Sequence, residues 1–531
     1  MGSRSFVLAF VFSTIFVFLG FHLYKIQIQH GSEYSSRAEA QNRGIKEEYR
    51  ERGSLFFTDK HGNEIPVAIN KEYPLIYAVP KEIVEKEEIV QFLARVSNRP
   101  EGEIKALIAK RNSLYAPIVL KATNEQVRQV KEYKGKGVYV KNKLSRFYPF
   151  GDLASHLLGF VGFDKAGERL EGRYGIEQFY EDTLLKKESN SLYLSIDRTI
   201  QSEARDILAE LIKKHSAAGG TIIVQDPKTG KILALENQPN FNPNEYEKYP
   251  VKYFLNPAVQ AVYEPGSVLK VVTMALGLDR RKVTPETTYI DKGEITINDK
   301  TIRNWDQKAY GITTMSQIIE RSINTGAVFV ERAIGHNDFY EGLLSFGFGK
   351  KTGVGIPGEV VGNLQNLEKK NRNDVDFATA SFGQGISMTP LQLISAVSAL
   401  AYKGILMKPL ILKNEKPVPM RQVISLRASR EIVDMMTSAV DKAEIAAIPH
   451  YSVAGKTGTA EVPDFVRGGY THTYIHTYAG FAPSSDPQFT ILIKLDKPQN
   501  APVAAVTVVP AFRELTQFLL NYYNIPPDRL P

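Results

Sequence analysis

Ser267 and Lys270 are the residues of this sequence whose types and spacing first suggest chemistry. They form the one place in the chain where a serine stands three residues before a lysine. Pro265 and Gly266 come directly before the serine, as at a helix start, and an apolar run follows. Residues three apart share a helix face, so the lysine amine can take the serine proton if burial or a second cation lowers its pKa. The pattern predicts a nucleophile and its base, although an ordinary buried helix could carry the same two residues.

Two further motifs follow along the chain. Ser322 and Asn324 form a Ser-x-Asn motif in a segment, 314–334, whose apolar spacing predicts a helix. A Lys-Thr-Gly triplet at 456–458 lies in a predicted strand, 452–459, where glycine lets a substrate backbone approach closely. Ser-x-x-Lys, Ser-x-Asn and Lys-Thr-Gly together make up a motif set of serine acyl-enzymes. The set predicts one active site assembled from three distant segments.

The Lys-Thr-Gly triplet by itself carries no weight, because it occurs three times in the chain. The triplet at Lys228 lies in a turn between two predicted strands, and the triplet at Lys351 lies in a glycine-rich loop. The triplet at Lys456 does not belong to a phosphate-binding loop either, because His450 stands where that motif needs glycine. Only the triplet at Lys456 combines strand context with a position after the other two motifs.

Composition narrows the classes of function. The 531 residues suffice for two or three domains. The net charge of +8 favours contact with anionic polymers or lipid head groups, although an ordinary soluble surface with slightly more base than acid accounts for it equally well. No basic–aromatic run argues for nucleic acid. The absence of cysteine excludes disulfides, thiol catalysis and cysteine-based zinc sites. His472 and His476 would share one strand face, but two ligands without a carboxylate rarely form a metal site, so we predict neither metal nor cofactor.

The N-terminal stretch 5–24 is almost entirely apolar and carries no charge before Lys25. About 20 such residues match the hydrocarbon core of a bilayer, and no small-residue cleavage site follows them. We therefore predict an uncleaved transmembrane signal anchor at 5–24, with residues 1–4 as a short cytoplasmic tail and all chemistry on the other side. Positive charge on the two flanks is nearly balanced, so charge alone leaves the orientation open.

Two domains are predicted after the anchor. Residues 25–190 mix short strands, charged helices and glycine-rich aromatic loops, which we interpret as an elongated α+β pedestal. Residues 191–531 open with a β-hairpin around a turn at 226–230, continue with helices and close with strands. This order predicts a mixed α/β fold, with an antiparallel sheet assembled from both ends of the domain and helices packed on it. The main predicted elements are helices at 267–278, 314–334, 389–402 and 429–442 and strands at 221–225, 231–235, 452–459, 472–481 and 488–495.

With these motifs in place, the sequence resembles a class B penicillin-binding protein, a monofunctional peptidoglycan D,D-transpeptidase. The resemblance covers nearly the whole chain, and Ile323 replaces Asp in the second motif, which still reads Ser-x-Asn. It implies the transpeptidase fold of the serine β-lactamases for 191–531 and a pedestal or dimerisation-like domain for 25–190. Other stretches that carry the resemblance are 52–53, 146–151, 172–177, 263–266, 383–385, 389–392 and 480–483.

The resemblance also implies catalytic roles. Ser267 attacks the carbonyl between the two terminal D-Ala residues of a stem peptide. Lys270, kept partly neutral by the nearby Lys456, accepts the proton of Ser267. Ser322 relays that proton to the leaving amine, and Asn324 orients the substrate amide. We expect Lys270 Nζ within hydrogen-bond reach of Ser267 Oγ, with Lys456 close by.

The same resemblance implies that residues of the third motif bind the substrate. Thr457 and Thr459 hold the terminal carboxylate together with Lys456, and Gly458 lets the substrate approach the strand. The backbone N–H groups of Ser267 and Thr459 form the oxyanion hole. An amine on a neighbouring strand then resolves the acyl-enzyme into a crosslink, and β-lactams acylate Ser267 as mimics of D-Ala-D-Ala.

Alternatives remain open from the sequence: an elongation-type transpeptidase, a β-lactam sensor or β-lactamase-like acyl-enzyme, and a scaffold with an idle catalytic set. No Glu-x-x-Leu-Asn stretch of class A β-lactamases is present, and 25–190 looks too short and mixed for a glycosyltransferase domain. The short C-terminal end at 501–531 looks closer to division-type members. The resemblance implies attachment to the inner membrane with an extracytoplasmic catalytic domain. Its implied partners are a SEDS-type glycosyltransferase and other divisome or elongasome membrane proteins.

Overall fold

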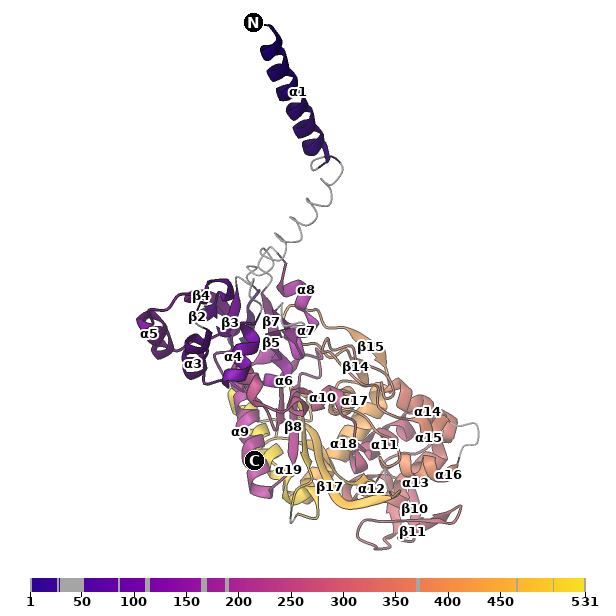
Figure 1. The fold of residues 1–531 in the computed structure, drawn as a ribbon. Coiled ribbons are helices and arrows are strands. Elements are labelled where there is room, and N and C mark those ends of the chain that lie inside the picture. Colours follow the sequence, from indigo (N-terminus) through magenta and orange to yellow (C-terminus); the bar gives the residue numbers. More distant parts are fainter. Residues whose placement is uncertain are drawn as a thin grey trace.

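The computed structural model describes residues 2–25, 28, 52–84, 86–109, 115–163, 170–186, 191–368, 373–464, 467–499 and 501–529. The predicted anchor at 5–24 lies within one helix, α1 (Gly2–Tyr24). Across the described ranges, no helix has both the length and the apolar character needed to cross a membrane. Most of the start of the predicted pedestal, 26–27 and 29–51, lies outside the described residues. The remaining elements form a small lobe and a large lobe (Figure 1).

A five-stranded antiparallel sheet organises the large lobe. Its strands are β8 (Gly219–Gln225), β9 (Ile232–Gln238), β16 (Ala454–Pro463), β17 (Tyr470–Ala482) and β18 (Phe489–Asp496). They run in the order β16-β17-β18-β8-β9 across the sheet, so β8 from the start of the domain pairs with β18 from its end. The prediction of a sheet assembled from both ends is therefore confirmed. The inner strand β8 is buried along its whole length, which accounts for its apolar run, whereas β16 forms an edge.

Helices cover both faces of this sheet (Figure 1). The described helices of the large lobe are α9 (Arg198–His215), α10 (Pro257–Gln260), α11 (Lys270–Asp279), α12 (Met315–Arg321), α13 (Asn324–Ile334), α14 (His336–Ser345), α15 (Gln365–Glu368), α16 (Asp374–Ala380), α17 (Pro390–Ala401), α18 (Leu426–Ala443) and α19 (Val508–Tyr522). α9 and α19 pack on one face, and α17 and α18 pack on the other, where α11 contacts α18. α9 begins where the Asp197 carboxylate accepts the N–H groups of Thr199 and Ile200. α17 begins with a capping box of Thr389 and Gln392.

Short elements complete the large lobe and flank its helices. The strand pairs are β10 (Thr288–Asp291) with β13 (Gly311–Thr314), β11 (Glu294–Ile297) with β12 (Lys300–Arg303), and β14 (Ile405–Met407) with β15 (Pro419–Gln422). The short 3-10 turns are η3 (Pro243–Lys248), η4 (Val251–Phe254), η5 (Gly266–Leu269) and η6 (Ala504–Val506). β10 and β12 both contact α13, so this part of the lobe supports the segment that carries the Ser-x-Asn motif.

The small lobe is an α+β unit, as predicted for the pedestal. Its elements are β1 (Leu55–Thr58), β2 (Glu64–Ala78), η2 (Pro80–Glu82), α3 (Lys86–Ser97), α4 (Glu101–Leu107), β3 (Ala116–Val119), α5 (Asn124–Glu132), β4 (Val138–Phe147), α6 (Ser155–Leu158), β5 (Phe160–Phe163), β6 (Leu170–Arg173), α7 (Gly175–Phe179), α8 (Glu181–Leu184) and β7 (Leu192–Asp197). β1 pairs in antiparallel with β2 and in parallel with β7, the strand that leads into α9. Arg52 and Arg146 both bind the buried Glu177 carboxylate, at 2.5 and 2.6 Å, and so hold three distant segments together.

Candidate active site

Ser267 lies in the turn η5, which leads directly into α11. It is partly exposed, whereas Gly266, Val268 and Leu269 are buried, so a reactant can reach this side chain in an otherwise closed turn. Gly266 has a φ of 55°, and a Cβ there would lie 3.1 Å from the Thr459 carbonyl oxygen. Glycine is therefore required directly before the predicted nucleophile.

Ser322 lies between the side chains of the two predicted active-site lysines. Lys270 Nζ donates to the Ser322 carbonyl oxygen at 2.6 Å and to Ser322 Oγ at 3.2 Å. Lys456 Nζ donates to the same Oγ at 2.9 Å. The two lysines are almost fully buried, with 1% and 4% of their surfaces exposed. The three sequence motifs therefore meet at one hydroxyl group.

The conformation of Ser322 makes this meeting possible. The sequence predicted one continuous helix over 314–334, and this prediction is wrong, because α12 ends at Arg321 and α13 begins at Asn324. Ser322 has a φ of 58°, in the left-handed region, so its carbonyl group leaves the axis of α12 and meets Lys270. The sequence gives no sign of this break, because the residue at the helix end is a serine and not the glycine or asparagine that usually marks one.

The expected direct contact between Lys270 and Ser267 is not formed in this conformation. The hydrogen bonds of Lys270 Nζ go to Ser322, and none within the described part of the chain joins it to Ser267 Oγ. Ser267 and Lys270 still lie one helical turn apart, at the junction of η5 and α11. The lysine that we predicted as the base of Ser267 is thus held by the second motif instead.

Burial dominates the electrostatics of the two lysines. Burial and the positive charge of Lys456 hold the pKa of Lys270 well below its usual value of 10.5. Burial lowers the pKa of Lys456 to about 7. If both amines were charged, two cations would face one hydroxyl group in a buried site. Burial and the neighbouring charge therefore both favour the neutral form of Lys270, the form that can accept a proton.

Asn324, the last residue of the second motif, opens α13. Its Nδ2 donates to the Arg303 carbonyl oxygen at 2.8 Å, and its Oδ1 can act only as an acceptor. Its own backbone N–H donates to Asn304 Oδ1 at 3.1 Å, and Asn304 Nδ2 donates to Asp291 Oδ2 at 3.0 Å. Asn304 and Asp291 were missed by the sequence analysis, since nothing in residues 288–314 resembles a catalytic motif. They hold the start of α13 in place.

The strand β16 brings the third motif against the nucleophile turn. A Cβ on Gly458 would lie 2.6 Å from the Pro265 carbonyl oxygen and 2.9 Å from Val268, so only glycine allows this approach. Thr459 Oγ1 accepts the Ala504 N–H at 3.1 Å. Thr459 Oγ1 is thus an acceptor here, and its hydroxyl group can still donate one hydrogen bond.

Glu264 is a third residue to which the sequence analysis gave no role. Its Oε1 accepts the Gly385 N–H at 3.0 Å, and its Oε2 accepts from Tyr470 Oη at 3.1 Å. Gly266 N–H donates to the Gly383 carbonyl oxygen at 3.1 Å beside it. Burial raises the pKa of Glu264 to about 6. The Glu264 carboxylate therefore connects the nucleophile turn to the 383–385 loop and to the start of β17. The one sequence feature that could have indicated its role is its position three residues before Ser267.

The other candidate residues take no part in this cluster. The Lys228 triplet occupies the β8–β9 turn, where Lys228 Nζ pairs with Asp486 at 2.8 Å. In the second triplet, the N–H groups of Thr352 and Gly353 donate to one carboxylate in a loop. His476 is buried, with its pKa lowered to about 4 by burial, and its Nδ1 lies 2.9 Å from a threonine hydroxyl. Among the described residues, no three histidine, aspartate or glutamate side chains group together as metal ligands.

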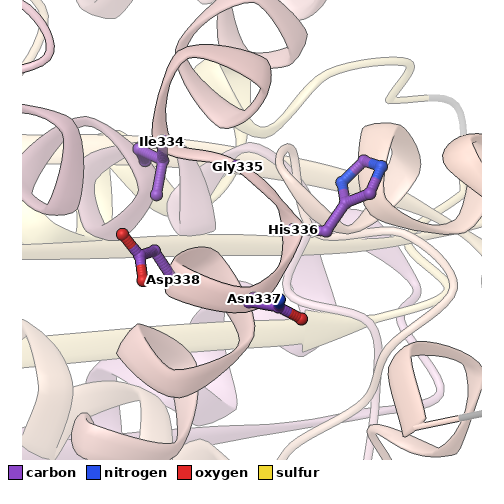
Figure 2. Close-up of a pocket in the computed structure, with 5 residues that line it drawn as sticks. All are labelled: Ile334, Gly335, His336, Asn337 and Asp338. Carbon is purple, nitrogen blue, oxygen red and sulfur yellow. The ribbon is translucent and has the colours of Figure 1, made fainter.

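A hollow of about 540 Å³ lies at the junction of α13 and α14, lined by residues 334–338 (Figure 2). His336 and Asp338 point to different sides of this junction in Figure 2. The hollow is at the far end of α13 from Asn324, about 15 Å along the helix axis at 1.5 Å per residue. It is therefore separate from the Ser267 cluster.

Family comparisons agree with this geometry. Residues 220–516 match the model described as Penicillin binding protein transpeptidase domain, and residues 48–198 match the one described as Penicillin-binding Protein dimerisation domain. The chain is 31% identical to Stage V sporulation protein D of Bacillus subtilis (strain 168), over 92% of this chain and 80% of that protein. It is 30% identical to peptidoglycan D,D-transpeptidase FtsI of Escherichia coli (strain K12), over 89% of this chain and 84% of that protein.

A solved structure supports the same fold. The crystal structure of a peptidoglycan synthetase from Bifidobacterium adolescentis matches with a TM-score of 0.68 and 23% sequence identity. The match covers 91% of this chain and 97% of that chain, so it includes both lobes.

Proposed function

The chain belongs to the class B penicillin-binding proteins, and on this premise we propose how its residues carry out the family's reaction. It is a serine-type peptidoglycan D,D-transpeptidase of cell-wall synthesis, with peptidoglycan peptides as substrates and β-lactams as ligands. One observation supports the assignment of roles above all others, the convergence of Lys270 and Lys456 on Ser322 Oγ. It gathers one base, one cation and one proton carrier beside the turn of Ser267.

In the acylation step, neutral Lys270 takes the hydroxyl proton of Ser267 while Ser267 Oγ bonds to the carbonyl carbon of the penultimate D-Ala. For this step Lys270 Nζ turns from Ser322 toward Ser267, which lies one helical turn away, and it returns to Ser322 Oγ once it holds the proton. The C–N bond to the terminal D-Ala then breaks. Its amine takes up the proton from Lys270 through Ser322 Oγ, so D-Ala departs neutral at nitrogen and an ester remains on Ser267.

Substrate binding falls to β16 and to the start of α13. Lys456, Thr457 and the Thr459 hydroxyl bind the terminal carboxylate, and Gly458 keeps the strand close enough for this. Asn324 Oδ1 accepts an amide N–H of the stem peptide and so orients the scissile carbonyl group. The backbone N–H groups of Ser267 and Thr459 stabilise the oxyanion, an effect typically worth about 3 kcal/mol per donor. The close packing of Gly266 and Gly458 at this point supports that placement.

The second half-reaction restores the enzyme. An amine from a neighbouring stem peptide attacks the ester carbonyl, Lys270 accepts its proton, and Ser267 Oγ leaves and is reprotonated. The product is the crosslink. β-Lactams open their ring on Ser267 by the first step and remain as a stable ester.

Fluorescent penicillin labelling of the purified full chain in detergent tests these roles. We expect covalent label on the parent protein and none on Ser267→Ala. The control is Ser345→Ala, whose hydroxyl donates to a carbonyl within α14 and contacts no motif residue. Labelling of Ser267→Ala at the parent rate, or absence of label on folded parent protein, would refute the assignment of the nucleophile.

We also propose that α1 anchors the chain in the inner membrane through residues 5–24, of which the described side chains, Phe10 to Tyr24, make up only part. Residues 1–4 then form the cytoplasmic tail, 25–190 the pedestal and 191–531 the extracytoplasmic transpeptidase domain. From Phe10 to Tyr24 every side chain of α1 is exposed, and most are large and apolar, a surface that lipid or a membrane partner would cover. Fractionation of a tagged chain after alkaline extraction of membranes tests this, and release of the full chain into the supernatant would count against it.

A role in septal synthesis beside a SEDS-type glycosyltransferase and other divisome proteins follows as a proposal. The similarity to the FtsI protein supports division over the elongation-type alternative, in which the partners belong to the elongasome. A fluorescent fusion is expected at the septum, and a fusion that labels only the side wall would favour elongation. Co-purification after crosslinking tests the polymerase partner.

A further inference from the structure

One face of the small lobe combines basic and aromatic side chains in a way that the active site does not use. The face belongs to β2 and β4, and its residues point away from α3 and α5. The opposite face, with Ile76 and Val138, is buried against those helices. We call it the lysine–tyrosine face and define it by Lys71, Tyr73, Tyr77, Tyr139, Lys141 and Phe147.

The strand register places these side chains together. Tyr77 pairs with Tyr139, and Leu75 pairs with Lys141. Directly opposed residues of an antiparallel pair share a face, and residues two apart along a strand share it too. The face thus runs along β2 and β4 for about 20 Å between Lys71 and Tyr77, at about 3.3 Å per residue. Figure 1 places these strands at the end of the molecule opposite α12 and α13.

Lysine ammonium groups sit over the rings along this face. Lys71 Nζ lies 4.8 Å from the ring centroid of Phe147 and 5.5 Å from that of Tyr73. Lys141 Nζ lies 5.4 Å from the ring centroid of Tyr77. Such cation–π contacts hold the ammonium groups and rings in one array, so little side-chain entropy is lost when a ligand binds there.

Two neighbours from outside the pair extend the array. Lys141 Nζ lies 4.4 Å from the ring centroid of Tyr115, and Lys121 Nζ lies 5.3 Å from that of Tyr73. Among the described residues, acidic groups meet this array at its ends, where the Tyr139 hydroxyl donates to Glu82 and where the negative charges of Glu245 and Glu247 act on Lys121. No aspartate or glutamate occupies this face between Ile69 and Tyr77 or at the paired positions of β4.

These properties fit a polymer that offers sugar rings and carboxylates in alternation. The C–H faces of pyranose rings stack on aromatic rings, and carboxylates pair with ammonium groups. A membrane surface is the competing ligand, because aromatic and basic side chains also bind interfacial lipid, and the vesicle experiment below separates the two. We propose that the lysine–tyrosine face binds a peptidoglycan strand, its rings contacting the glycan and its lysines the carboxylates of the stem peptides. The identity of this polymer rests on the proposed function.

Co-sedimentation of the full chain in detergent with purified insoluble peptidoglycan, freed of attached polymers, tests the proposal. The test variant carries Lys71→Gln and Lys141→Gln. The control variant carries Lys105→Gln and Lys131→Gln, two exposed lysines of α4 and α5 in the same lobe with the same change in net charge. All proteins are first treated with penicillin, so that the Ser267 site cannot bind the sediment. We expect the test variant to bind roughly tenfold more weakly and the control variant within about twofold of the parent.

Two further probes separate the sources of binding. Peptidoglycan whose carboxylates have been converted to amides is expected to bind the parent as weakly as native peptidoglycan binds the test variant. Equal losses in the test and control variants would overturn the proposal, and so would parent protein that binds phosphatidylglycerol vesicles but not peptidoglycan. Fluorescent penicillin labelling of both variants is expected at the parent rate. A parent that takes no label would refute the proposed function, whereas labelled variants with unchanged sedimentation would refute only this inference.

Discussion

The charge on Lys456 should set the pH at which Ser267 becomes reactive, and Lys456→Met measures that effect. Methionine keeps most of the buried stem and removes the cation. Lys270 Nζ and Lys456 Nζ lie 3.2 and 2.9 Å from Ser322 Oγ, so the two nitrogens are about 6 Å apart at most. At an effective dielectric constant of about 20, two unit charges at that distance repel by about 3 kcal/mol, equivalent to about 2 pKa units.

The direction of the shift follows from the base. Lys270 acts in its neutral form, and removal of the neighbouring cation raises its pKa, so acylation should need a higher pH. Because Lys456 itself has a pKa of about 7, it is only partly charged at neutral pH. We therefore expect the acidic limb of the acylation profile to move up by about 1 to 2 pH units.

The assay is the second-order rate of fluorescent penicillin acylation measured from pH 5 to pH 10. Loss of the contact between Lys456 and the penicillin carboxylate should lower the acylation rate at every pH. This uniform loss can be separated from a shift of the acidic limb along the pH axis. Lys228→Met is the matched control, since it lies in a Lys-Thr-Gly triplet outside the site and should leave the profile unchanged. A limb that keeps its position in Lys456→Met would refute the coupling between the two lysines.

Three other predictions concern the support of the site and the fold. Gly458→Ala should lower the free energy of unfolding by about 1–3 kcal/mol and abolish penicillin labelling, because its Cβ would meet the Pro265 carbonyl oxygen at 2.6 Å; thermal melts and labelling check this. Burial raises the pKa of Glu236 to about 8. Its contribution to the free energy of unfolding is therefore full below about pH 4.5 and is lost as the pH rises through 8, a change of up to about 5 kcal/mol. Glu236→Gln should flatten the melting temperature between pH 5 and 9, and equal slopes for both proteins would contradict this. Asp528→Ala should cost about 1–2 kcal/mol in denaturant unfolding, because Asp528 Oδ1 accepts the Ser452 N–H at 2.7 Å, with penicillin labelling retained.

The three active-site motifs could be predicted from the sequence because their chemistry requires particular residue types at short spacings. Ser267 and Lys270 lie three apart, and the Lys-Thr-Gly triplet whose lysine meets Ser322 could be chosen by its strand context. The residues that hold these motifs in place could not be found this way. The Glu264 carboxylate and the Gly385 N–H that it accepts are 121 residues apart in the chain. Asn304 likewise caps α13 only through the tertiary fold.

Local signals also explain which parts of the fold were predicted. The β8–β9 hairpin has turn chemistry of its own, and alternating strands at the end of the chain complete the sheet. The break at Ser322 depends instead on tertiary contacts, because the left-handed conformation of a serine is stabilised there by Lys270 and Lys456. The lysine–tyrosine face was equally hidden, since its side chains come from separate strands and form no basic–aromatic run. The sequence analysis reported no such run, although the surface exists.

The parallel pairing of β1 with β7 has a mechanical consequence. Leu55 lies opposite Leu192, so the chain leaves and re-enters the same sheet at neighbouring points. Everything between Thr58 and Leu192 is therefore a side branch on the path from the N-terminal segment to the transpeptidase sheet. A pull on that segment would load the β1–β7 pair along its length, in shear, and would bypass most of the small lobe. The lobe is then able to engage a polymer or a partner without carrying that tension.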